Sequence, residues 1–165
     1  MIIRSEIAAD ISAIRKLTDA AFQDVQHSSQ TEGAIVDALR LAGALAISLV
    51  AEKDGEILGH LAFSPVLIDG QDIGWFGLGP VSVSPTVQRS GIGSALIKEG
   101  LKSLRDRGAL GSVVLGDPDY YQRFGFTSAH NLRYSDVPAT YFQSIAFADP
   151  PAKGVVTYHD GFEAQ

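Results

Sequence analysis

The spacing of apolar residues near the N-terminus predicts a short strand followed by two amphipathic helices. Ile2 and Ile3 begin the strand, and Asp10 suits the N-cap of the first helix. The second helix begins near Thr31 and Glu32. One face of each helix is apolar at three- or four-residue spacing. These inward faces consist of Ile11, Ile14, Leu17, Ala21 and Phe22 in the first helix, and of Ile35, Val36 and Leu39 in the second.

Three strand-like stretches follow, separated by two tight turns. They span residues 46–52, 56–67 and 72–83. Asp54-Gly55 and Asp69-Gly70 lie between them. Asp-Gly pairs are typical of two-residue hairpin turns, because these turns require positive φ angles. The three strands are therefore expected to form an antiparallel meander.

Glycine and proline interrupt the third strand at Gly77 and at Gly79-Pro80. A glycine within a strand usually marks a bulge, and a proline cannot donate a hydrogen bond to the ladder. We expect a bulge that splays this strand away from its next neighbour. The alternative is a simple break between two short strands.

A helix over residues 91–107 and a buried strand over residues 112–115 complete a strand–helix–strand unit. Ile92, Leu96 and Leu104 are expected to face the sheet. Such a crossover is right-handed and joins parallel neighbours. If the bulge separates the two parallel strands, an open wedge results that an extended ligand arm could enter.

The remaining chain shows fewer regular patterns. Asp117 and Pro118 are expected to open a short helix that Gly125 ends, and Phe126 to begin another strand. Residues 154–158 have the composition of a last strand. The aromatic residues in between lie among prolines and predict irregular packed segments: Tyr134, Tyr141, Phe142 and Phe147.

Length, charge and cysteine content narrow the class of protein. With 165 residues, 45% of them hydrophobic, the chain fits one domain, residues 1–165. No apolar run approaches the roughly 18 residues of a membrane span, and the N-terminus lacks the layout of a signal peptide. The formal charge of −6 argues against a nucleic-acid partner and mildly favours cationic substrates such as amines. The absence of cysteine excludes thiol nucleophiles and fits a cytoplasmic protein. The sequence does not decide whether the chain forms a homodimer.

The turn before the third helix reads Gln88-Arg89-Ser90-Gly91-Ile92-Gly93. Glycines leave the backbone bare, and the first amides of a helix are free to bind a phosphate. A P-loop would need Gly-Lys-Ser/Thr, but Ser94 follows Gly93. A dinucleotide fingerprint would need a small residue where Leu96 stands. The turn instead matches the Gln/Arg-x-x-Gly-x-Gly/Ala signature of the pyrophosphate loop in GNAT acyltransferases.

A second motif lies one helix and one strand further along the chain. The run from Tyr121 to Phe126, YQRFGF, matches the Tyr-x-x-x-Gly-Phe pattern often found in GNAT proteins. With both motifs in order, the chain resembles the small bacterial branch of GNAT N-acetyltransferases, most clearly over residues 46–126. The resemblance implies the GNAT fold, of class α+β (α/β). That fold has a mixed sheet of about six or seven strands, with an antiparallel meander, a splayed parallel pair and about four helices.

The same resemblance implies transfer of an acetyl group from acetyl-CoA to an amine of a small molecule or protein, by direct attack in a ternary complex and without a metal. The backbone of the turn would bind the pyrophosphate, helped by the hydroxyls of Ser90 and Ser94 and the charge of Arg89. The pantetheine arm would pair with the preceding strand as an added strand does. The cofactor-binding residues so implied are Val81, Ser82, Val83, Gln88, Arg89, Ser90, Gly91, Ile92, Gly93, Ser94 and Tyr121.

Two catalytic groups are expected from the resemblance, a proton donor and a base. Tyr121 would protonate the departing thiolate, because tyrosine is protonated at neutral pH; the alternative is a packing aromatic residue. Family members often use as base a Glu near the strand before the loop, or a chain of water molecules, and this strand has no Glu. Glu32, His27 and His60 are the candidates. We favour Glu32 as a substrate contact, while His60 has the apolar neighbours of a core histidine. The four scattered histidines show no metal-ligand spacing.

Two other functions are compatible with the turn. A CoA-binding regulatory module that has lost catalysis would keep the loop, but it would have no turnover for a Tyr121→Phe substitution to remove. A dinucleotide-binding protein is disfavoured by Leu96 and by the residues between the strand and the turn.

Overall fold

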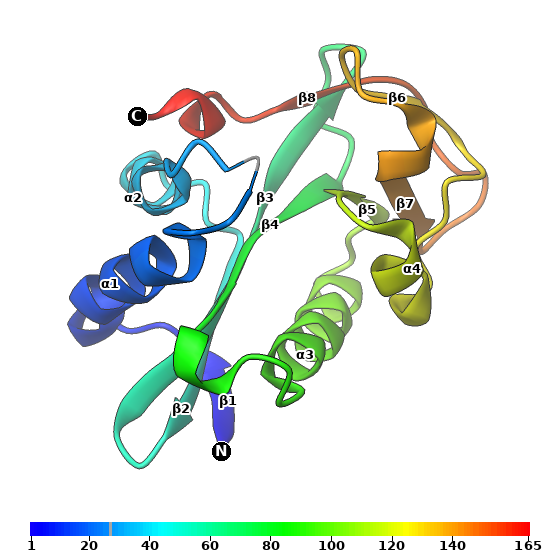
Figure 1. The fold of residues 1–165 in the computed structure, drawn as a ribbon. Coiled ribbons are helices and arrows are strands. Elements are labelled where there is room, and N and C mark those ends of the chain that lie inside the picture. Colours follow the sequence, from blue (N-terminus) through cyan, green and yellow to red (C-terminus); the bar gives the residue numbers. More distant parts are fainter. Residues whose placement is uncertain (27) are drawn as a thin grey trace.

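The computed structural model describes residues 1–26 and 28–165. Figure 1 shows the arrangement of its strands and helices. In the described chain the longest helix, α3, has 15 residues, and none is long and apolar enough to cross a membrane. The strands are β1 (Ile2–Ser5), β2 (Ile47–Lys53), β3 (Glu56–Ile68), β4 (Trp75–Val83), β5 (Gly111–Leu115), β6 (Asn131–Arg133), β7 (Phe142–Ala146) and β8 (Lys153–Tyr158). The α-helices are α1 (Ile11–Phe22), α2 (Glu32–Leu41), α3 (Ile92–Asp106) and α4 (Pro118–Tyr121).

The strands form one mixed sheet in the order β1-β2-β3-β4-β5-β7, and β8 pairs with the end of β3 and with β6. The pairs β1–β2, β2–β3 and β3–β4 are antiparallel, the last two as the Asp-Gly turns predict, and β4 and β5 are parallel. The predicted fold class, with its meander, parallel pair and four helices, is confirmed. The described chain has eight strands, whereas the sequence predicts six or seven, because β6 and β7 lie in the stretch expected to be irregular.

Helices cover the two faces of the sheet separately. In Figure 1, α1 and α2 lie on one side of β3 and β4, and α3 lies on the other. Strand β2 shows how alternation produces this arrangement. Leu49 is buried in the cluster that contains Leu96 of α3, whereas its neighbour Val50 packs with Ile14 of α1 and Val36 of α2. The core is therefore divided into two layers by the sheet.

A bulge interrupts the pairing of β3 and β4 at Gly79 and Pro80. Leu61 pairs with Val81, but Phe63 pairs with Leu78, so that one residue of β3 faces two of β4. Strand β4 is continuous, and the alternative of two short strands is wrong. On its other side β4 pairs with β5 only from Trp75 to Gly77. The two parallel strands then separate, and the predicted wedge is confirmed.

Three local predictions differ from the structure. Asp10 precedes α1, but its carboxylate accepts from the backbone N–H of Ile7 at 2.8 Å and pairs with Arg4 at 2.7 Å instead of capping the helix. Ile11 is 36% exposed rather than inward. Phe126 does not begin a strand, and only the next residue forms an isolated bridge. The edge of β5 that this segment would have extended is taken by β7, which comes later in the chain.

Candidate active site

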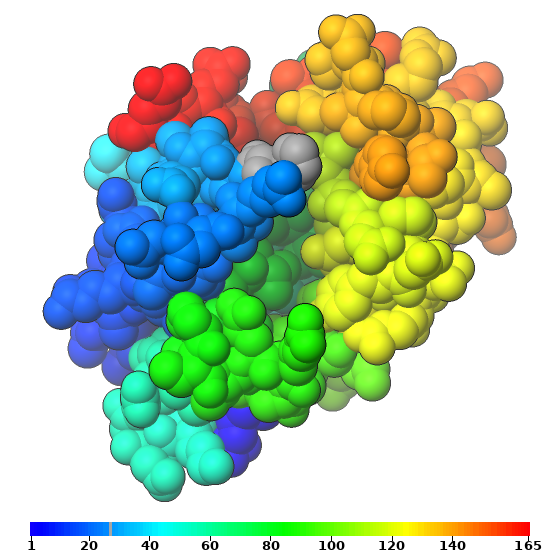
Figure 2. Space-filling view, viewed as in Figure 1, coloured from blue at the N-terminus to red at the C-terminus, as the bar shows by residue number. Residues whose placement is uncertain are grey.

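A cavity of about 670 Å³ lies in the wedge between β4 and the segment that follows β5. In Figure 2 it is the hollow bordered by α1 in blue, the turn before α3 in bright green and α4 in yellow-green. It brings the two sequence motifs together. The turn contributes Gln88, Arg89, Gly91, Ile92, Gly93 and Ser94; β4 contributes Val81 and Val83; the second motif and its flank contribute Tyr120, Tyr121 and Arg123; and α1 and the loop after it contribute Ala21, Phe22 and Val25.

The turn presents backbone amides that have no acceptor in the described protein. Arg89 and Gly91 both adopt left-handed conformations, with φ of 65° and 87°, and these conformations direct the chain into α3. The first amide of α3 to find an acceptor is that of Ala95, which donates to the carbonyl of Gly91 at 3.0 Å. The amides before it lie at the positive end of a 15-residue helix. This geometry suits the binding of an anion.

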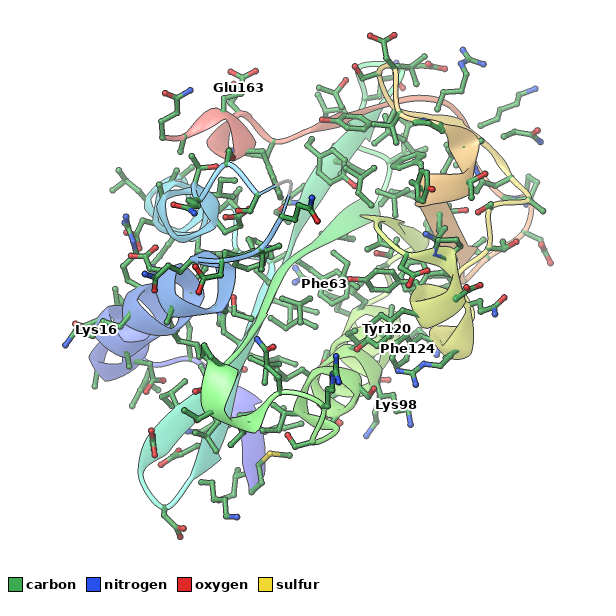
Figure 3. All side chains as sticks on the ribbon, viewed as in Figure 1. Lys16, Phe63, Lys98, Tyr120, Phe124 and Glu163 are labelled. Carbon is green, nitrogen blue, oxygen red and sulfur yellow. The ribbon has the colours of Figure 1, made fainter. Side chains whose placement is uncertain are left out.

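Gly93 leaves room for a tyrosine beside the turn. A Cβ at this position would stand 3.3 Å from Oη of Tyr120. Tyr120 also stacks edge-on against Phe124 at a centroid distance of 5.3 Å. Figure 3 shows both rings between α4 and α3, with Lys98 pointing away from them. Tyr120 therefore packs beside the turn, and it is Tyr121 that lies between β4 and β5.

A second cation joins Arg89 at this site. Arg123 donates from Nη2 to Oγ of Ser94 at 3.2 Å, and its guanidinium carbon lies 4.6 Å from the centre of the Tyr120 ring. Sequence reasoning missed Arg123. Its position, a cation within the Tyr-x-x-x-Gly-Phe motif, was the available signal. Guanidinium groups are the side chains best able to bind phosphate oxygens in pairs.

Two predicted site residues do not line the cavity. The hydroxyl of Ser90 donates to the carbonyl of Val87 inside the turn. Ser82 is 1% exposed, and its hydroxyl donates to Thr18 of α1 at 3.4 Å, on the face of the sheet that α1 covers. The side chain of Gln88 lines the cavity and donates to the carbonyl of Val83 at 3.3 Å.

The free edge of β4 presents the main chain of Val81 and Val83 to the wedge. The N–H of Ser84 donates to the carbonyl of Leu58 at 2.8 Å, on β3. Because successive residues of a strand direct their main-chain groups to opposite sides, those of Ser82 also face β3. Val81 and Val83 then face the side where β5 has separated. An extended ligand could pair there as an added strand does.

Tyr121 is held by close packing around its ring. A Cβ on Gly116 would stand 2.6 Å from Cε2 of the ring, so glycine is required there. The ring of Phe126 lies edge-on to it at a centroid distance of 5.9 Å. Burial raises the pKa of Tyr121 to about 12, and the neighbouring Tyr120 and Asp117 act in the same direction. Tyr121 is therefore a protonated hydroxyl at neutral pH.

A second cavity, of about 390 Å³, adjoins the first. We call it the acceptor pocket because we propose that the acceptor amine binds there. Phe22, Val81 and Tyr121 line both cavities. The acceptor pocket is further lined by Glu32, Ile35, Leu78, Gly79, Pro80, Leu115, Tyr134, Tyr158 and Phe162. Sequence reasoning missed the three C-terminal rings: Tyr134 is predicted to pack in an irregular segment, Tyr158 to end the last strand, and the pattern around Phe162 predicts nothing.

Glu32 stands at the start of α2 and enters the acceptor pocket with Tyr121. Both of its carboxylate oxygens accept from the hydroxyl of Ser28, at 2.8 and 2.9 Å. A carboxylate in the first turn of a helix is favoured by the helix dipole. The candidate His27 lies outside the described residues.

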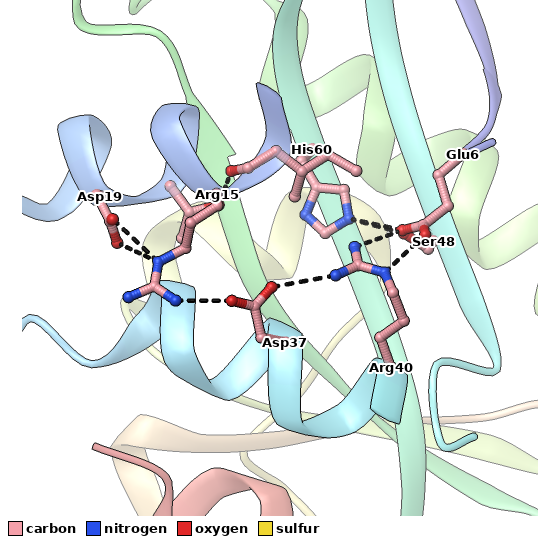
Figure 4. A network of polar contacts seen from close by, with 9 residues as sticks. Glu6, Arg15, Asp19, Asp37, Arg40, Ser48 and His60 are labelled. Carbon is pink, nitrogen blue, oxygen red and sulfur yellow. Dashed lines mark hydrogen bonds and ion pairs between the residues drawn. The ribbon is translucent and has the colours of Figure 1, made fainter. Parts of the chain in front are cut away.

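His60 lies in the core and lines neither cavity. Its Nε2 is 2.8 Å from the hydroxyl of Ser48, which donates to Glu6. Glu6 in turn pairs with Arg40 at 2.9 Å (Figure 4). Burial lowers the pKa of His60 to about 4; Arg40 lowers it further, and Glu6 opposes them. His60 therefore belongs to a structural network between α2 and the sheet.

A family profile described as "Acetyltransferase (GNAT) domain" matches residues 3–129. The chain belongs to the GNAT acetyltransferase family. Over 98% of each chain it is 39% identical to "Uncharacterized N-acetyltransferase YhbS" of Escherichia coli K12. The resemblance found in the sequence is confirmed, and the protein is a GNAT N-acetyltransferase.

Two solved structures share the whole fold. A GNAT family acetyltransferase from Brucella melitensis, solved in complex with acetyl-CoA, is 53% identical; the match covers 98% of this chain and 97% of that one, with a TM-score of 0.88. YhbS from Escherichia coli, solved in complex with CoA, is 37% identical; the match covers 98% of this chain and 91% of that one, and the TM-score is 0.87.

Proposed function

We propose that this GNAT acetyltransferase binds acetyl-CoA in the wedge and transfers its acetyl group to a primary amine by direct attack in a ternary complex. One observation carries the proposal: Tyr121 lines both cavities, one with the anion-binding turn and the other with Glu32. The reacting atoms would meet beside the Tyr121 hydroxyl. The relatives solved with acetyl-CoA and CoA support the choice of donor.

In this proposal the donor lies along β4 and ends at α3. The pyrophosphate is held by the free amides at the start of α3 and by the guanidinium groups of Arg89 and Arg123. The pantetheine arm pairs with the exposed main chain of Val81 and Val83. The thioester then reaches the point where the wedge meets the acceptor pocket.

The chemistry requires one bond to form and one to break. The neutral nitrogen of the amine attacks the carbonyl carbon of the thioester, and negative charge develops on the carbonyl oxygen. A main-chain N–H of β4 stabilises that charge. The carbon–sulfur bond then breaks, and Tyr121 donates its proton to the leaving thiolate. The proton that the nitrogen loses on becoming an amide restores Tyr121.

Glu32 is proposed to hold the acceptor and to receive a proton from it. An amine arrives as an ammonium group, which hydrogen-bonds to a carboxylate and must be deprotonated before it attacks. Among the described residues that line the acceptor pocket, Glu32 is the one carboxylate.

Donor binding is tested by a thermal shift with acetyl-CoA, with NAD as the control. A ligand at about 100 times its Kd adds about 2.7 kcal/mol to the free energy of unfolding. For a chain of this size that raises the Tm by roughly 5 to 10 °C. A shift with NAD but not with acetyl-CoA would support the dinucleotide alternative and overturn the proposal.

Catalysis is tested by release of the CoA thiol in the presence of amines. Tyr121→Phe should lower kcat about 100-fold or more and leave the Kd for acetyl-CoA unchanged. Tyr141→Phe, at a tyrosine that is 53% exposed, is the control. A wild-type protein that binds acetyl-CoA without turning over any amine would instead be the CoA-binding module.

A further inference from the structure

We infer that the acceptor is a small primary amine on an uncharged, ring-bearing body, without a carboxylate or phosphate. This inference rests on the proposed function, because it assigns the acceptor pocket to the amine. This class of acceptor follows from three features of the residues that line the pocket. They are a single charged group, several aromatic rings and one buried hydroxyl that has no hydrogen-bond partner among the described residues.

The pocket offers one charge and many rings. Five aromatic side chains line it: Phe22, Tyr121, Tyr134, Tyr158 and Phe162. Among its described residues Glu32 is the one charged side chain, and none is cationic. An ammonium group pairs with that carboxylate, whereas a carboxylate on the substrate would meet no cationic side chain among these residues and would be repelled by Glu32. Free amino acids are therefore poor acceptors.

Tyr158 contributes a ring and a hydroxyl group to the lining residues of the pocket. A Cβ on Gly77 would stand 2.6 Å from Cε1 of its ring, so the ring lies directly on β4. The rings of Tyr134 and Phe162 flank it at centroid distances of 4.9 and 5.0 Å. Its Oη is buried and has no hydrogen-bond partner among the described residues. A hydroxyl on the substrate would satisfy it, because a buried polar group without a partner is destabilising.

The C-terminal segment makes the wall that limits the substrate's size. Phe162 lies in the turn Asp160–Glu163, after β8. A Cβ on Gly161 would stand 2.8 Å from Cδ2 of Leu39, so this turn is packed tightly against α2. The volume of about 390 Å³ is at the small end of small-molecule pockets. It fits a monoamine with a single ring.

The inference is tested with matched amines at saturating acetyl-CoA. 2-Phenylethylamine and L-phenylalanine differ by one carboxylate, and the amine should have a kcat/KM about 100-fold higher. Tyramine adds a ring hydroxyl to 2-phenylethylamine and should be the better substrate by about tenfold, because it satisfies Tyr158. A lysine-containing peptide and spermidine, both without a ring on the amine, should be poorer than either.

Two variants connect these preferences to the residues. Glu32→Gln should raise the KM for tyramine about 30-fold and leave that for acetyl-CoA unchanged. Glu99→Gln, at an exposed position of α3, is its control. Tyr158→Phe should remove the preference for tyramine over 2-phenylethylamine without lowering the Tm, because the lost hydroxyl had no partner.

The outcomes separate this inference from the proposed function. If L-phenylalanine or the peptide matches tyramine, the acceptor class is wrong while acetyl transfer stands. If tyramine is preferred but Tyr158→Phe and Glu32→Gln leave the preferences and the KM unchanged, the inference also fails. If acetyl-CoA does not bind at all, the proposed function fails and takes this inference with it.

Discussion

Arg123 donates a hydrogen bond to Ser94 across the wedge, from Nη2 to Oγ at 3.2 Å. Arg123 follows α4, and Ser94 lies in the first turn of α3. The bond therefore joins the two sides of the donor cavity at the end where the amides are free. It also holds a guanidinium group where phosphate oxygens would lie.

Removing this cation should weaken donor binding modestly. We expect Arg123→Gln to raise the Kd for acetyl-CoA about fivefold at low salt, because an exposed charge contributes little. The effect should shrink as salt screens the interaction. Titration calorimetry at two salt concentrations measures it, with Lys98→Gln on the outward face of α3 as the control. Equal losses in both variants would mean that net charge alone is responsible.

Two glycines with the same backbone geometry allow a matched test of the turn. Gly91 and Gly108 have φ of 87° and 85°, and a Cβ at either would meet nothing within 4 Å. Each change to alanine should lower the free energy of unfolding by about 1 kcal/mol, because alanine avoids positive φ. Only Gly91→Ala should also weaken acetyl-CoA binding severalfold, because its methyl group enters the donor cavity. Equal binding by both variants would contradict the anion site.

The pH dependence of turnover should show no loss from ionisation of Tyr121 below about pH 10. Its pKa is raised to about 12, so the hydroxyl keeps its proton over that range. The rate should rise with pH as the amine loses its proton. Profiles of kcat/KM for the wild type and Tyr121→Phe provide the measurement. A fall near pH 8 to 9 that disappears in Tyr121→Phe would show that this assignment is wrong.

Acid should destabilise the fold through His60. Below pH 6.5 the unfolded chain binds a proton at this histidine that the folded chain does not bind until about pH 4. The free energy of unfolding should therefore fall by about 3 kcal/mol between these pH values. The lowered pKa of Glu6 continues the loss at lower pH: Arg40 and Ser48 outweigh the burial that raises it. Urea titrations of the wild type and His60→Gln test this, and a wild-type curve flat from pH 7 to pH 4 would contradict it.

The donor half of the site could be predicted from sequence because its determinants are local. The bulge at Gly79-Pro80, the Asp-Gly turns and the free amides after Gly91 each follow from a few adjacent residues. The family motifs then indicate acetyl-CoA as the ligand that binds there. Glu32 could be placed at the start of a helix for the same reason, but its approach to Tyr121 depends on the packing of distant segments.

Strand β7 shows why the C-terminal half was harder to predict. The sequence predicts an irregular packed segment here, but Phe142–Ala146 is a strand in which even the polar Gln143 and Ser144 are only 1% and 4% exposed. The side-chain amide of Gln143 donates to the carbonyl of Gly116 at 2.9 Å, and the main chain of Ser144 bridges to that of Thr127. Both partners are distant in sequence, and no pattern within the strand reveals them.

The two cavities are built largely from different parts of the chain, and this affects how the substrate of such an enzyme can change. The donor cavity is built mainly from residues 81–94 and 120–123, whereas the distal wall of the acceptor pocket comes from Tyr134, Tyr158 and Phe162. Tyr121 is one of the few side chains that serve both. If the acceptor binds there as proposed, mutations in the last third of the chain can change which amine is acetylated while the donor cavity stays intact.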